Sequence, residues 1–419
     1  MHPNALLDLA TELLRQVLKL DAPADQTVSA FLRRHRTLGP RERHTLAETA
    51  YAVLRQRLLL SHLAQSGSGA LERRLAMLAW QGSDTFLRSA LGPNEQKWLA
   101  EVQALDRSAL PEKLRHNLPD WLAQPLREEL GDEFWDLVAA MEKSAPLDLR
   151  VNLLKAKRED VLEALAAAGH EAAATPHSPW GVRLAGKPAL QKLPLFIEGW
   201  VEVQDEGSQL LAAMTGAKRG EMVVDFCAGA GGKTLALGAM MRNTGRLYAF
   251  DVAGHRLDNL KPRLARSSLS NVYPAVIAHE RDDRIKRLAG KIDRVLVDAP
   301  CSGLGTLRRN PDLKWRQSPK ALDELCAKQA SILDSAARLV KPGGRLVYAT
   351  CSLLQRENEG IADAFSAAHP EFQPMPALEL LQAAQVSGAE QLVSGNHLRL
   401  WPHRHQTDGF FATAWQRKA

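Results

Sequence analysis

One stretch of the chain, Val223 to Thr234, combines a carboxylate, a thiol and a run of small residues. Its apolar start predicts a buried strand that ends at Asp225, and Thr234 begins a predicted helix. Between them, no bulky side chain occurs from Ala228 to Gly232. Such a turn lets backbone N–H groups at a helix N-terminus approach a ligand closely. The stretch therefore predicts a ligand-binding turn at the end of a strand.

Spacing separates three ligand classes that use this arrangement. A phosphate-binding P-loop needs a glycine where this chain has Cys227, and a dinucleotide fingerprint needs its third glycine where this chain has Thr234. The pattern acidic-x-[Gly/Cys]-x-Gly-x-Gly, typical of class I S-adenosylmethionine (SAM) methyltransferases, is intact from Asp225 to Gly231. Asp251 closes the next predicted strand, where a carboxylate would meet the ribose of adenosine.

Two thiols follow the ends of two further predicted strands. Cys301 comes shortly after the strand 292–298, and Cys351 directly follows the strand 345–350. Ligands of parallel α/β sheets collect at the carboxyl ends of the strands, so we expect both thiols and Asp298 to lie near the glycine turn. Spacing does not decide which of the two thiols reacts.

A methyl donor beside a pair of thiols suits one chemical problem, the methylation of cytosine at C5. This carbon does not attack a sulfonium unaided, but it becomes nucleophilic once a thiolate has added to C6. An unperturbed cysteine has a pKa of about 8.5, so the reacting thiol needs positive charge or a helix N-terminus nearby. The basic residues that we consider for this role are Lys233, Arg308 and Lys314.

Length and cysteine content limit the class of protein. A chain of 419 residues has room for two or three domains. Four cysteines without a C-x-x-C spacing indicate reduced thiols, and neither a disulfide framework nor a zinc site. We find no signal peptide and no run of about 18 apolar residues. We therefore expect a cytoplasmic protein with no membrane segment and no metal, and we also expect a monomer.

Basic residues are unevenly distributed along the chain. The formal net charge is +6, and residues 1–150 hold 19 Lys and Arg against 20 Asp and Glu, which leaves 35 and 28 in the remainder. The basic excess therefore lies in the part with the glycine turn, as expected for a part that grips a phosphate backbone. The basic run after Cys301 fits a phosphate grip better than a solvated surface, with Trp315 as a stacking ring. The run consists of Arg308, Arg309, Lys314, Arg316 and Lys320.

The hydrophobic pattern divides the chain into three predicted domains. Residues 1–143 carry apolar positions at intervals of three and four, which predicts an all-helical domain. Residues 146–204 indicate a small α/β segment of RRM-like type, suited to an RNA platform. Residues 205–419 interleave strands and helices, which predicts a Rossmann-like, doubly wound parallel sheet. Its strands are expected at 222–225, 246–250, 272–277, 292–298, 345–350 and 409–415.

Several motifs resemble those of the RsmB/Nop2/Sun family of SAM-dependent RNA cytosine-C5 methyltransferases. The motifs are Asp-Phe-Cys-Ala-Gly-Ala-Gly-Gly-Lys-Thr at 225–234, Asp-Ala-Pro-Cys-Ser-Gly-Leu-Gly-Thr-Leu-Arg-Arg-Asn-Pro-Asp at 298–312, Thr-Cys-Ser at 350–352, Glu-Asn-Glu at 357–359 and Leu-Trp-Pro-His-Arg-His-Gln-Thr-Asp-Gly-Phe-Phe at 400–411. The resemblance covers residues 145–415. Residues 1–143 resemble the NusB-type RNA-binding domain of bacterial members, which act on ribosomal RNA.

The resemblance implies roles for individual residues. Cys351 would be the nucleophile, Cys301 would assist release of the product, and Asp298 would lie between cofactor and base. SAM would be bound by Cys227, Ala228, Gly229, Ala230, Gly231, Gly232, Lys233, Asp251, Asp282 and Asp298. Asp282 is chosen over Asp283 because it fits the family's Gly-Asp-x-Arg pattern, with arginine in place of the glycine. The implied partner is RNA, small-subunit ribosomal RNA in particular.

The chain departs from the family pattern in the glycine turn, and other functions compete with the one implied. Gly229 and Ala230 replace the family's usual Ala-Pro, so we expect a more flexible loop that still binds. A non-catalytic RNA-binding protein of the same fold is one alternative, and intact Cys301 and Cys351 argue against it. A P-loop nucleotidase is another, which Cys227 disfavours. Transfer RNA is the alternative substrate for the same chemistry.

Overall fold

The computed structural model describes residues 1–419, which form two compact units. The first, the helical unit, contains Met1–Ser144 and Thr306–Pro319. The second, the sheet unit, contains Ala145–Gly305 and Lys320–Ala419. The segment 306–319, predicted to belong to the catalytic domain, is therefore part of the helical unit.

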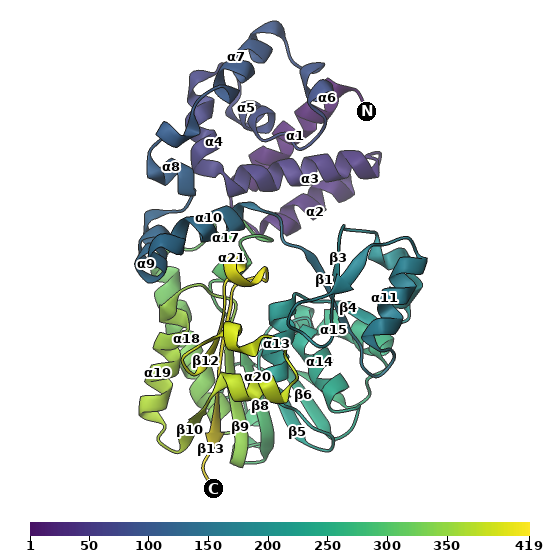
Figure 1. Ribbon diagram of the computed structural model, residues 1–419, viewed down its shortest axis with the longest axis vertical. Helices are drawn as coiled ribbons and strands as arrows, with labels where there is room; N and C mark the ends of the chain where they lie inside the picture. The colour runs from purple at the N-terminus through teal and green to yellow at the C-terminus, as the bar shows by residue number, and fades with distance from the viewer. The chain divides into compact units, whose positions relative to one another are not determined.

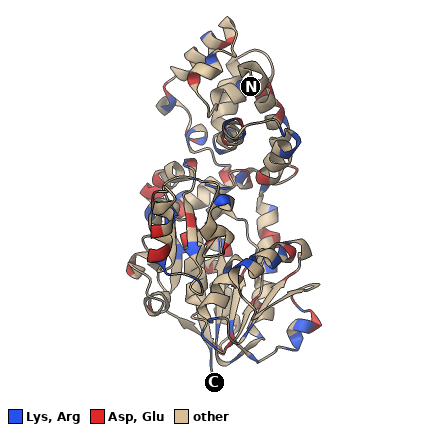
Figure 2. Cartoon of the chain, turned by 90° about the vertical axis from the view of Figure 1, so that its right-hand side faces the viewer, with Lys and Arg blue, Asp and Glu red and all other residues tan.

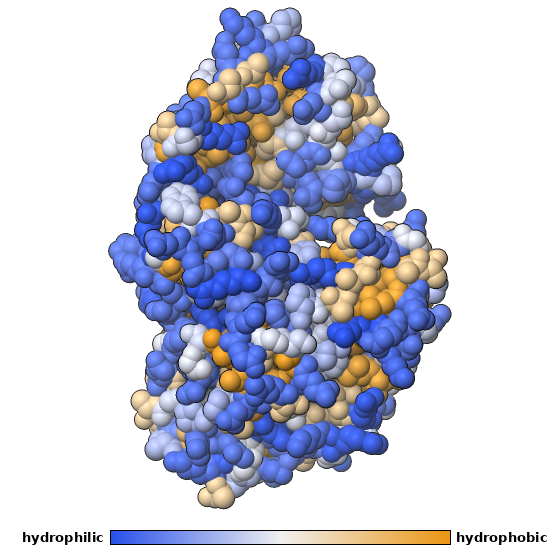
Figure 3. Space-filling view, viewed as in Figure 1, coloured by the Kyte–Doolittle hydropathy of each residue, from blue (hydrophilic) through white to orange (hydrophobic).

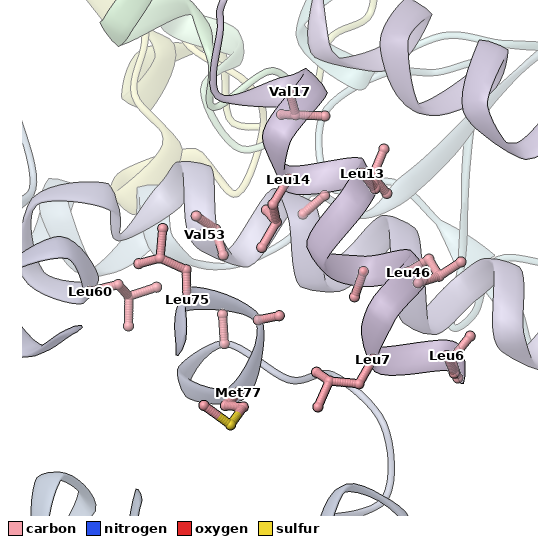
Figure 4. Close-up of a cluster of buried hydrophobic side chains, with 14 of the residues drawn as sticks. Leu6, Leu7, Leu13, Leu14, Val17, Leu46, Val53, Leu60, Leu75 and Met77 are labelled. Atoms are coloured by element: carbon pink, nitrogen blue, oxygen red, sulfur yellow. The ribbon is translucent and has the colours of Figure 1, made fainter. Parts of the chain in front are cut away.

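The helical unit is built from short amphipathic helices. They are α1 (Pro3–Val17), α2 (Ala24–Arg34), α3 (Pro40–Arg55), α4 (Arg57–Leu63), α5 (Leu71–Leu78), α6 (Asp84–Arg88), α7 (Pro93–Gln103), α8 (Glu112–His116), α9 (Asp120–Leu130), α10 (Phe134–Glu142) and α17 (Leu313–Arg316). Proline begins α1, α3 and α7, where its missing N–H leaves no intrahelical bond unmade. Figure 4 shows Leu14 of α1, Val53 of α3 and Leu75 of α5 in one buried cluster. The helical prediction for this part of the chain is confirmed.

A four-stranded antiparallel sheet opens the sheet unit. Its strands β1 (Leu147–Val151), β2 (Ala172–Ala174), β3 (Gly181–Leu184) and β4 (Val201–Val203) pair in the order β2-β3-β1-β4. Helix α11 (Arg158–Ala167) packs Val161 and Leu165 into a core with Leu149 and Val182 of this small sheet. The short helix α12 (Pro194–Ile197) precedes β4. The segment is thus α/β, as the pattern predicts.

A nine-stranded sheet forms the core of the sheet unit. Its strands are β5 (Met222–Asp225), β6 (Arg246–Asp251), β7 (Val272–Val276), β8 (Ile292–Asp298), β9 (Val340–Thr350), β10 (Phe372–Met375), β11 (Val393–Ser394), β12 (His397–Leu400) and β13 (Phe410–Arg417). The order is β11-β12-β13-β9-β8-β5-β6-β7, with β10 paired to β13. Strands β5 to β9 are mutually parallel, which confirms the Rossmann-like core.

The prediction of a parallel sheet is wrong at the C-terminal end of the chain. β13 runs antiparallel to β9, with Phe411 opposite Thr350 and Gln416 opposite Arg345. β10 and β12 are also antiparallel to β13. The alternation of apolar residues marks a strand but carries no information on its direction, so the pattern could not reveal the reversal.

Helices cover both faces of the large sheet (Figure 1). One face carries α13 (Glu206–Met214), α14 (Gly232–Met240) and α20 (Ala377–Ala383), and the other carries α16 (Asp283–Lys286), α18 (Pro319–Ala337) and α19 (Glu359–Ala368). The unit also contains α15 (Gly254–Ser267) and α21 (Pro402–His405). Along β9, Val347 and Ala349 join the first core, whereas Leu346 and Tyr348 join the second. The parallel strands therefore end at one edge, between two layers of helices.

Charged side chains of both signs are mixed over the surface. In Figure 2, positions of Lys and Arg and positions of Asp and Glu are interspersed along the ribbon of both units. The face drawn in Figure 3 is largely hydrophilic, with separate apolar patches. None of the helices is both long and apolar enough to span a membrane. No cluster of His, Cys, Asp and Glu side chains has the spacing of a metal site.

Candidate active site

The glycine turn lies between β5 and α14. Gly229 and Gly231 have φ angles of +56° and +83°, a region that favours glycine. A side chain at Gly231 would meet Leu260 Cδ1 at 2.1 Å, whereas nothing lies within 4 Å of the corresponding point at Gly229. The turn is thus closely packed on one side and open on the other, where a ligand can reach its backbone.

Two carboxylates at the ends of β5 and β6 border the turn. Asp251 accepts the N–H of Gly229 at 2.8 Å and the N–H of Ala253 at 2.7 Å. Asp225 accepts the hydroxyl of Thr234 at 2.7 Å through Oδ2, while its buried Oδ1 has no hydrogen-bond partner. Burial raises the pKa of Asp225 to about 7, against the opposing effect of the Thr234 bond. An unsatisfied acceptor therefore lies beneath the turn.

Lys233 links α14 to the end of β8. Its Nζ lies 2.7 Å from Asp298 Oδ2, and the side chain is 11% exposed. Burial alone would lower the pKa of Lys233, but Asp298 and the charge at Cys351 raise it above its ordinary value. The ammonium group therefore stays charged and is paired with Asp298 at the end of β8.

The two predicted thiols come together. β8 and β9 are parallel neighbours with Asp298 opposite Ala349, and the Sγ atoms of Cys301 and Cys351 beyond them are 3.4 Å apart. The hydrogen bond to Cys351, followed by burial, raises the pKa of Cys301 well above its ordinary value. Either sulfur can donate in this contact, so the geometry brings the two thiols together without deciding which one reacts.

Three sequence motifs meet at the thiols. The N–H of Gly305, beyond Cys301, donates to the carbonyl of Cys351 at 2.8 Å, and the N–H of Gly409 donates to the carbonyl of Gly305 at 2.8 Å. A side chain at Gly305 would meet the Gly409 carbonyl oxygen at 2.0 Å. This close approach explains why glycine stands at both positions.

The chain is similar to proteins of one known family. The family described as 16S rRNA methyltransferase RsmB/F matches residues 212–416, and a ferredoxin-like domain of RsmF/B-like methyltransferases matches residues 118–191. A relative from Synechocystis sp., named "Probable ribosomal RNA small subunit methyltransferase B", is 32% identical over 442 residues, which cover 96% of this chain and 97% of the relative. The chain belongs to the RsmB/F family of ribosomal RNA methyltransferases.

Other relatives agree with this assignment. A Bacillus subtilis protein of the same name is 31% identical over 340 residues, or 81% of this chain and 75% of that protein. The crystal structure of PH0851 has a TM-score of 0.81 and 27% identity, with 100% of this chain and 99% of that chain covered. This RsmB/F protein is therefore a transferase, an RNA methyltransferase with the methyltransferase fold.

The remaining predicted cofactor residues differ in how they are held. Burial, and then the charge of Asp298, raises the pKa of the Cys227 thiol well above its ordinary value, so Cys227 is not a thiolate. Asp282 caps the N-terminus of α16 and accepts the N–H groups of Ala278 at 3.0 Å and Arg284 at 2.9 Å. These bonds lower its pKa. The role of Asp282 in cofactor binding stays a prediction.

Two arginines that the sequence did not single out hold the glycine turn of this RsmB/F protein. Arg263 of α15 donates to the Ala230 carbonyl at 2.5 Å, and Arg150 of β1 donates to the Gly232 carbonyl at 2.6 Å. Glu202 of β4 accepts from Arg263 at 3.0 Å. No local pattern identifies these residues, because they come from distant parts of the chain and act on backbone atoms.

The predicted phosphate grip after Cys301 is wrong for Arg308 and Lys314, whose side chains are buried. Lys314 lies within the helical unit and donates to the Arg55 carbonyl at 2.7 Å, and burial lowers its pKa to about 7. Arg316 pairs with Asp312 at 3.3 Å. For Arg309, which is half-buried, RNA contact stays a prediction. The run of basic residues gave no sign that Lys314 is buried, because its burial depends on residues far along the chain.

Proposed function

We propose that this RsmB/F methyltransferase transfers a methyl group from SAM to C5 of a cytosine in small-subunit ribosomal RNA. The observation that carries the proposal is the pair of sulfur atoms of Cys301 and Cys351, 3.4 Å apart beside the charged Lys233. Methylation of most other positions in RNA needs no thiol, whereas C5 of cytosine needs a nucleophile that adds to C6.

The residues of the glycine turn fit SAM. The open backbone at Gly229 suits contact with the cofactor, Asp251 lies where a ribose would be recognised, and Asp225 Oδ1 offers a buried acceptor without a partner. Asp282 and Asp298 would complete the cofactor-binding residues. When bound, SAM supplies an electrophilic methyl carbon.

The protein residues would divide the chemistry between them. The Cys351 thiolate adds to C6, and Asp298 holds the exocyclic amine of the cytosine. After methylation the C5 proton passes to water, its bonding pair forms the C5=C6 double bond, and the C6–S pair leaves on Cys351 as a thiolate. The Cys301 S–H group donates to the departing sulfur and stabilises it. Cys351 thus acts as the nucleophile, and Cys301 assists product release.

The rest of the chain would bind RNA. We infer that residues 1–143 act as a NusB-like RNA-binding domain and residues 146–204 as an RRM-like platform. The match of residues 118–191 to a ferredoxin-like domain supports the second assignment. The catalytic domain would then comprise residues 205–419, except for the segment held in the helical unit.

Substitution of each thiol tests the mechanism. Cys351→Ala should abolish methyl transfer and leave SAM binding intact, because attack on C6 is lost and the cofactor residues are unchanged. Cys301→Ala should instead accumulate a covalent RNA–protein adduct, because release is slowed. The measurement uses labelled SAM with total RNA from cells that lack the protein, followed by denaturing gel electrophoresis.

Cys326→Ala is the matched control, since this half-buried thiol of α18 bonds to the Arg356 carbonyl and takes no part in the proposed reaction. It should methylate RNA at the wild-type rate. An adduct found only with Cys351→Ala would show that Cys301 is the nucleophile and Cys351 assists release. Full turnover by Cys351→Ala would show that Cys351 is not the nucleophile. Bisulfite sequencing of the same RNA locates the modified cytosine.

A further inference from the structure

A buried carboxylate joins the two loops that carry the thiols. Glu357, which is fully buried, accepts the Ser302 N–H at 2.7 Å and the Gln329 side-chain amide at 2.9 Å through Oε1. Its Oε2 accepts the hydroxyl of Ser302 at 2.5 Å and the hydroxyl of Ser352. Four neutral donors thus surround one carboxylate, and together they offset the cost of burying it.

The donors are the residues next to the reacting sulfurs. Ser302 directly follows Cys301, and Ser352 directly follows Cys351. The two serine hydroxyls are also 3.2 Å from each other. A single carboxylate therefore binds the residue next to each sulfur, and the sulfur separation of 3.4 Å depends on how the two loops approach each other.

The two loops do not depend on Glu357 to the same extent. The loop after β9 has other anchors, since Asn358 donates to the Ser352 carbonyl at 3.1 Å and Arg399 donates to the Leu353 carbonyl at 2.8 Å. The loop after β8 is anchored as well, since Gln329 donates to the Pro300 carbonyl at 3.0 Å and Gly305 donates to the Cys351 carbonyl at 2.8 Å. Ser302, however, gives Glu357 both its N–H and its hydroxyl, whereas Ser352 gives it only a hydroxyl. Loss of the carboxylate should therefore displace Cys301 more than Cys351.

We propose that Glu357 is a positioning residue that holds Cys301 against Cys351 for the release of methylated RNA. The inference rests on the proposed function, in which the Cys301 S–H group stabilises the Cys351 thiolate as the C6–S bond breaks. Glu357 does not touch the substrate in this scheme. It acts through Ser302 on the direction of the Cys301 thiol.

The first experiment compares Glu357→Ala with Glu357→Gln in the full chain. With labelled SAM and total RNA from cells that lack the protein, Glu357→Ala should accumulate the same covalent adduct as Cys301→Ala. Turnover should fall about 10- to 100-fold, as for a reacting group displaced by about 1 Å. The KM for SAM should not change, because no contact of the glycine turn is lost.

Glu357→Gln should recover part of the turnover. Its amide oxygen still accepts the Ser302 N–H, and the serine hydroxyls can rotate to accept from the amide nitrogen. Glu379→Gln, an exposed change on α20, is the matched control and should behave as wild type. Wild-type turnover by Glu357→Ala, or lost turnover without an adduct while Cys301→Ala does form one, would overturn the proposal.

A second experiment needs no RNA. Diamide oxidises two neighbouring thiols to a disulfide and is itself reduced to the hydrazine, and sulfurs 3.4 Å apart need little movement to form a bond of about 2.05 Å. Wild-type protein should form the Cys301–Cys351 disulfide about tenfold faster than Glu357→Ala, with Glu357→Gln between them. Peptide mapping by mass spectrometry identifies the linked cysteines.

The two experiments separate the possible failures. If wild-type protein methylates no cytosine, the proposed function fails, but the disulfide rates still measure the effect of Glu357 on the thiol pair. If wild type methylates RNA but Glu357→Ala forms the disulfide at the wild-type rate, the positioning role is overturned and the proposed function stands.

Discussion

Asp225 shows how one buried acid can make stability depend on pH. Its side chain is almost fully buried at the end of β5, and burial raises its pKa to about 7. In the unfolded chain the same group ionises near pH 3.8. Between these values the folded protein holds a proton that the unfolded chain has lost, so the free energy of unfolding falls as pH rises through this window. The contribution of the protonated Asp225 to the free energy of unfolding is therefore fully present below pH 3.8 and lost above about pH 7.

Asp225→Asn should remove this pH dependence. Asparagine keeps the shape and an acceptor for the Thr234 hydroxyl but does not titrate. Relative to wild type, the variant should gain stability between pH 4 and pH 8, by up to about 4 kcal/mol, since one pKa unit corresponds to about 1.4 kcal/mol. Urea unfolding at the two pH values measures the gain. A difference between variant and wild type that is equal at both values would contradict the assignment.

At the scale of the element, the glycine turn is held in place by side chains from other elements. The sequence suggested a more flexible loop, because Gly229 and Ala230 replace a usual proline. In the structure the Ala230 carbonyl is held by Arg263 of α15, which is fixed in turn by Glu202 of β4. Side chains from two other elements thus restrain backbone that the turn's own residues leave free.

Arg263→Gln should therefore weaken SAM binding without affecting the thiols. Loss of a charged hydrogen bond to the turn is worth about 1.5 kcal/mol, which corresponds to about a tenfold higher Kd. Titration calorimetry with SAM measures the change. Arg256→Gln, an exposed change on the same helix, should leave Kd unaltered. Equal Kd values for wild type and Arg263→Gln would show that the turn needs no external support.

Features that depend on neighbouring residues could be predicted from the sequence, whereas features that depend on residues far along the chain could not. The glycine turn and the thiols of Cys301 and Cys351 could be placed because a parallel strand sends its following residues to a known edge of the sheet. The direction of β13, the support from Arg263 and the burial of Lys314 could not be predicted. Each depends on partners far along the chain that leave no local periodicity.

At the scale of the whole molecule, the chain passes between its two units more than once. It leaves the sheet unit at Gly305, a few residues after Cys301, and returns at Lys320. Within the helical unit the intervening segment is well anchored, since Trp315 donates to the Leu54 carbonyl at 2.7 Å and Asp312 accepts the Ala24 N–H at 3.1 Å. The helical unit therefore includes sequence from inside the catalytic domain, and its stability depends on that segment.

Lys314 makes the stability of the helical unit depend on pH in the opposite direction to Asp225. Burial lowers its pKa to about 7, against 10.5 in the unfolded chain. Between these values the unfolded chain binds a proton that the folded unit does not, so the free energy of unfolding rises with pH. From pH 7 to pH 9 the rise should be about 2 kcal/mol, since one pKa unit corresponds to about 1.4 kcal/mol.

Lys314→Met should flatten this rise, because the thioether side chain fills similar space and does not titrate. Thermal unfolding of the full chain at pH 7, 8 and 9 measures the effect as a change in Tm of the helical unit. Lys97→Met, an exposed change on α7, should keep the wild-type slope. If Lys314→Met kept that slope as well, the lysine would be charged in the folded protein.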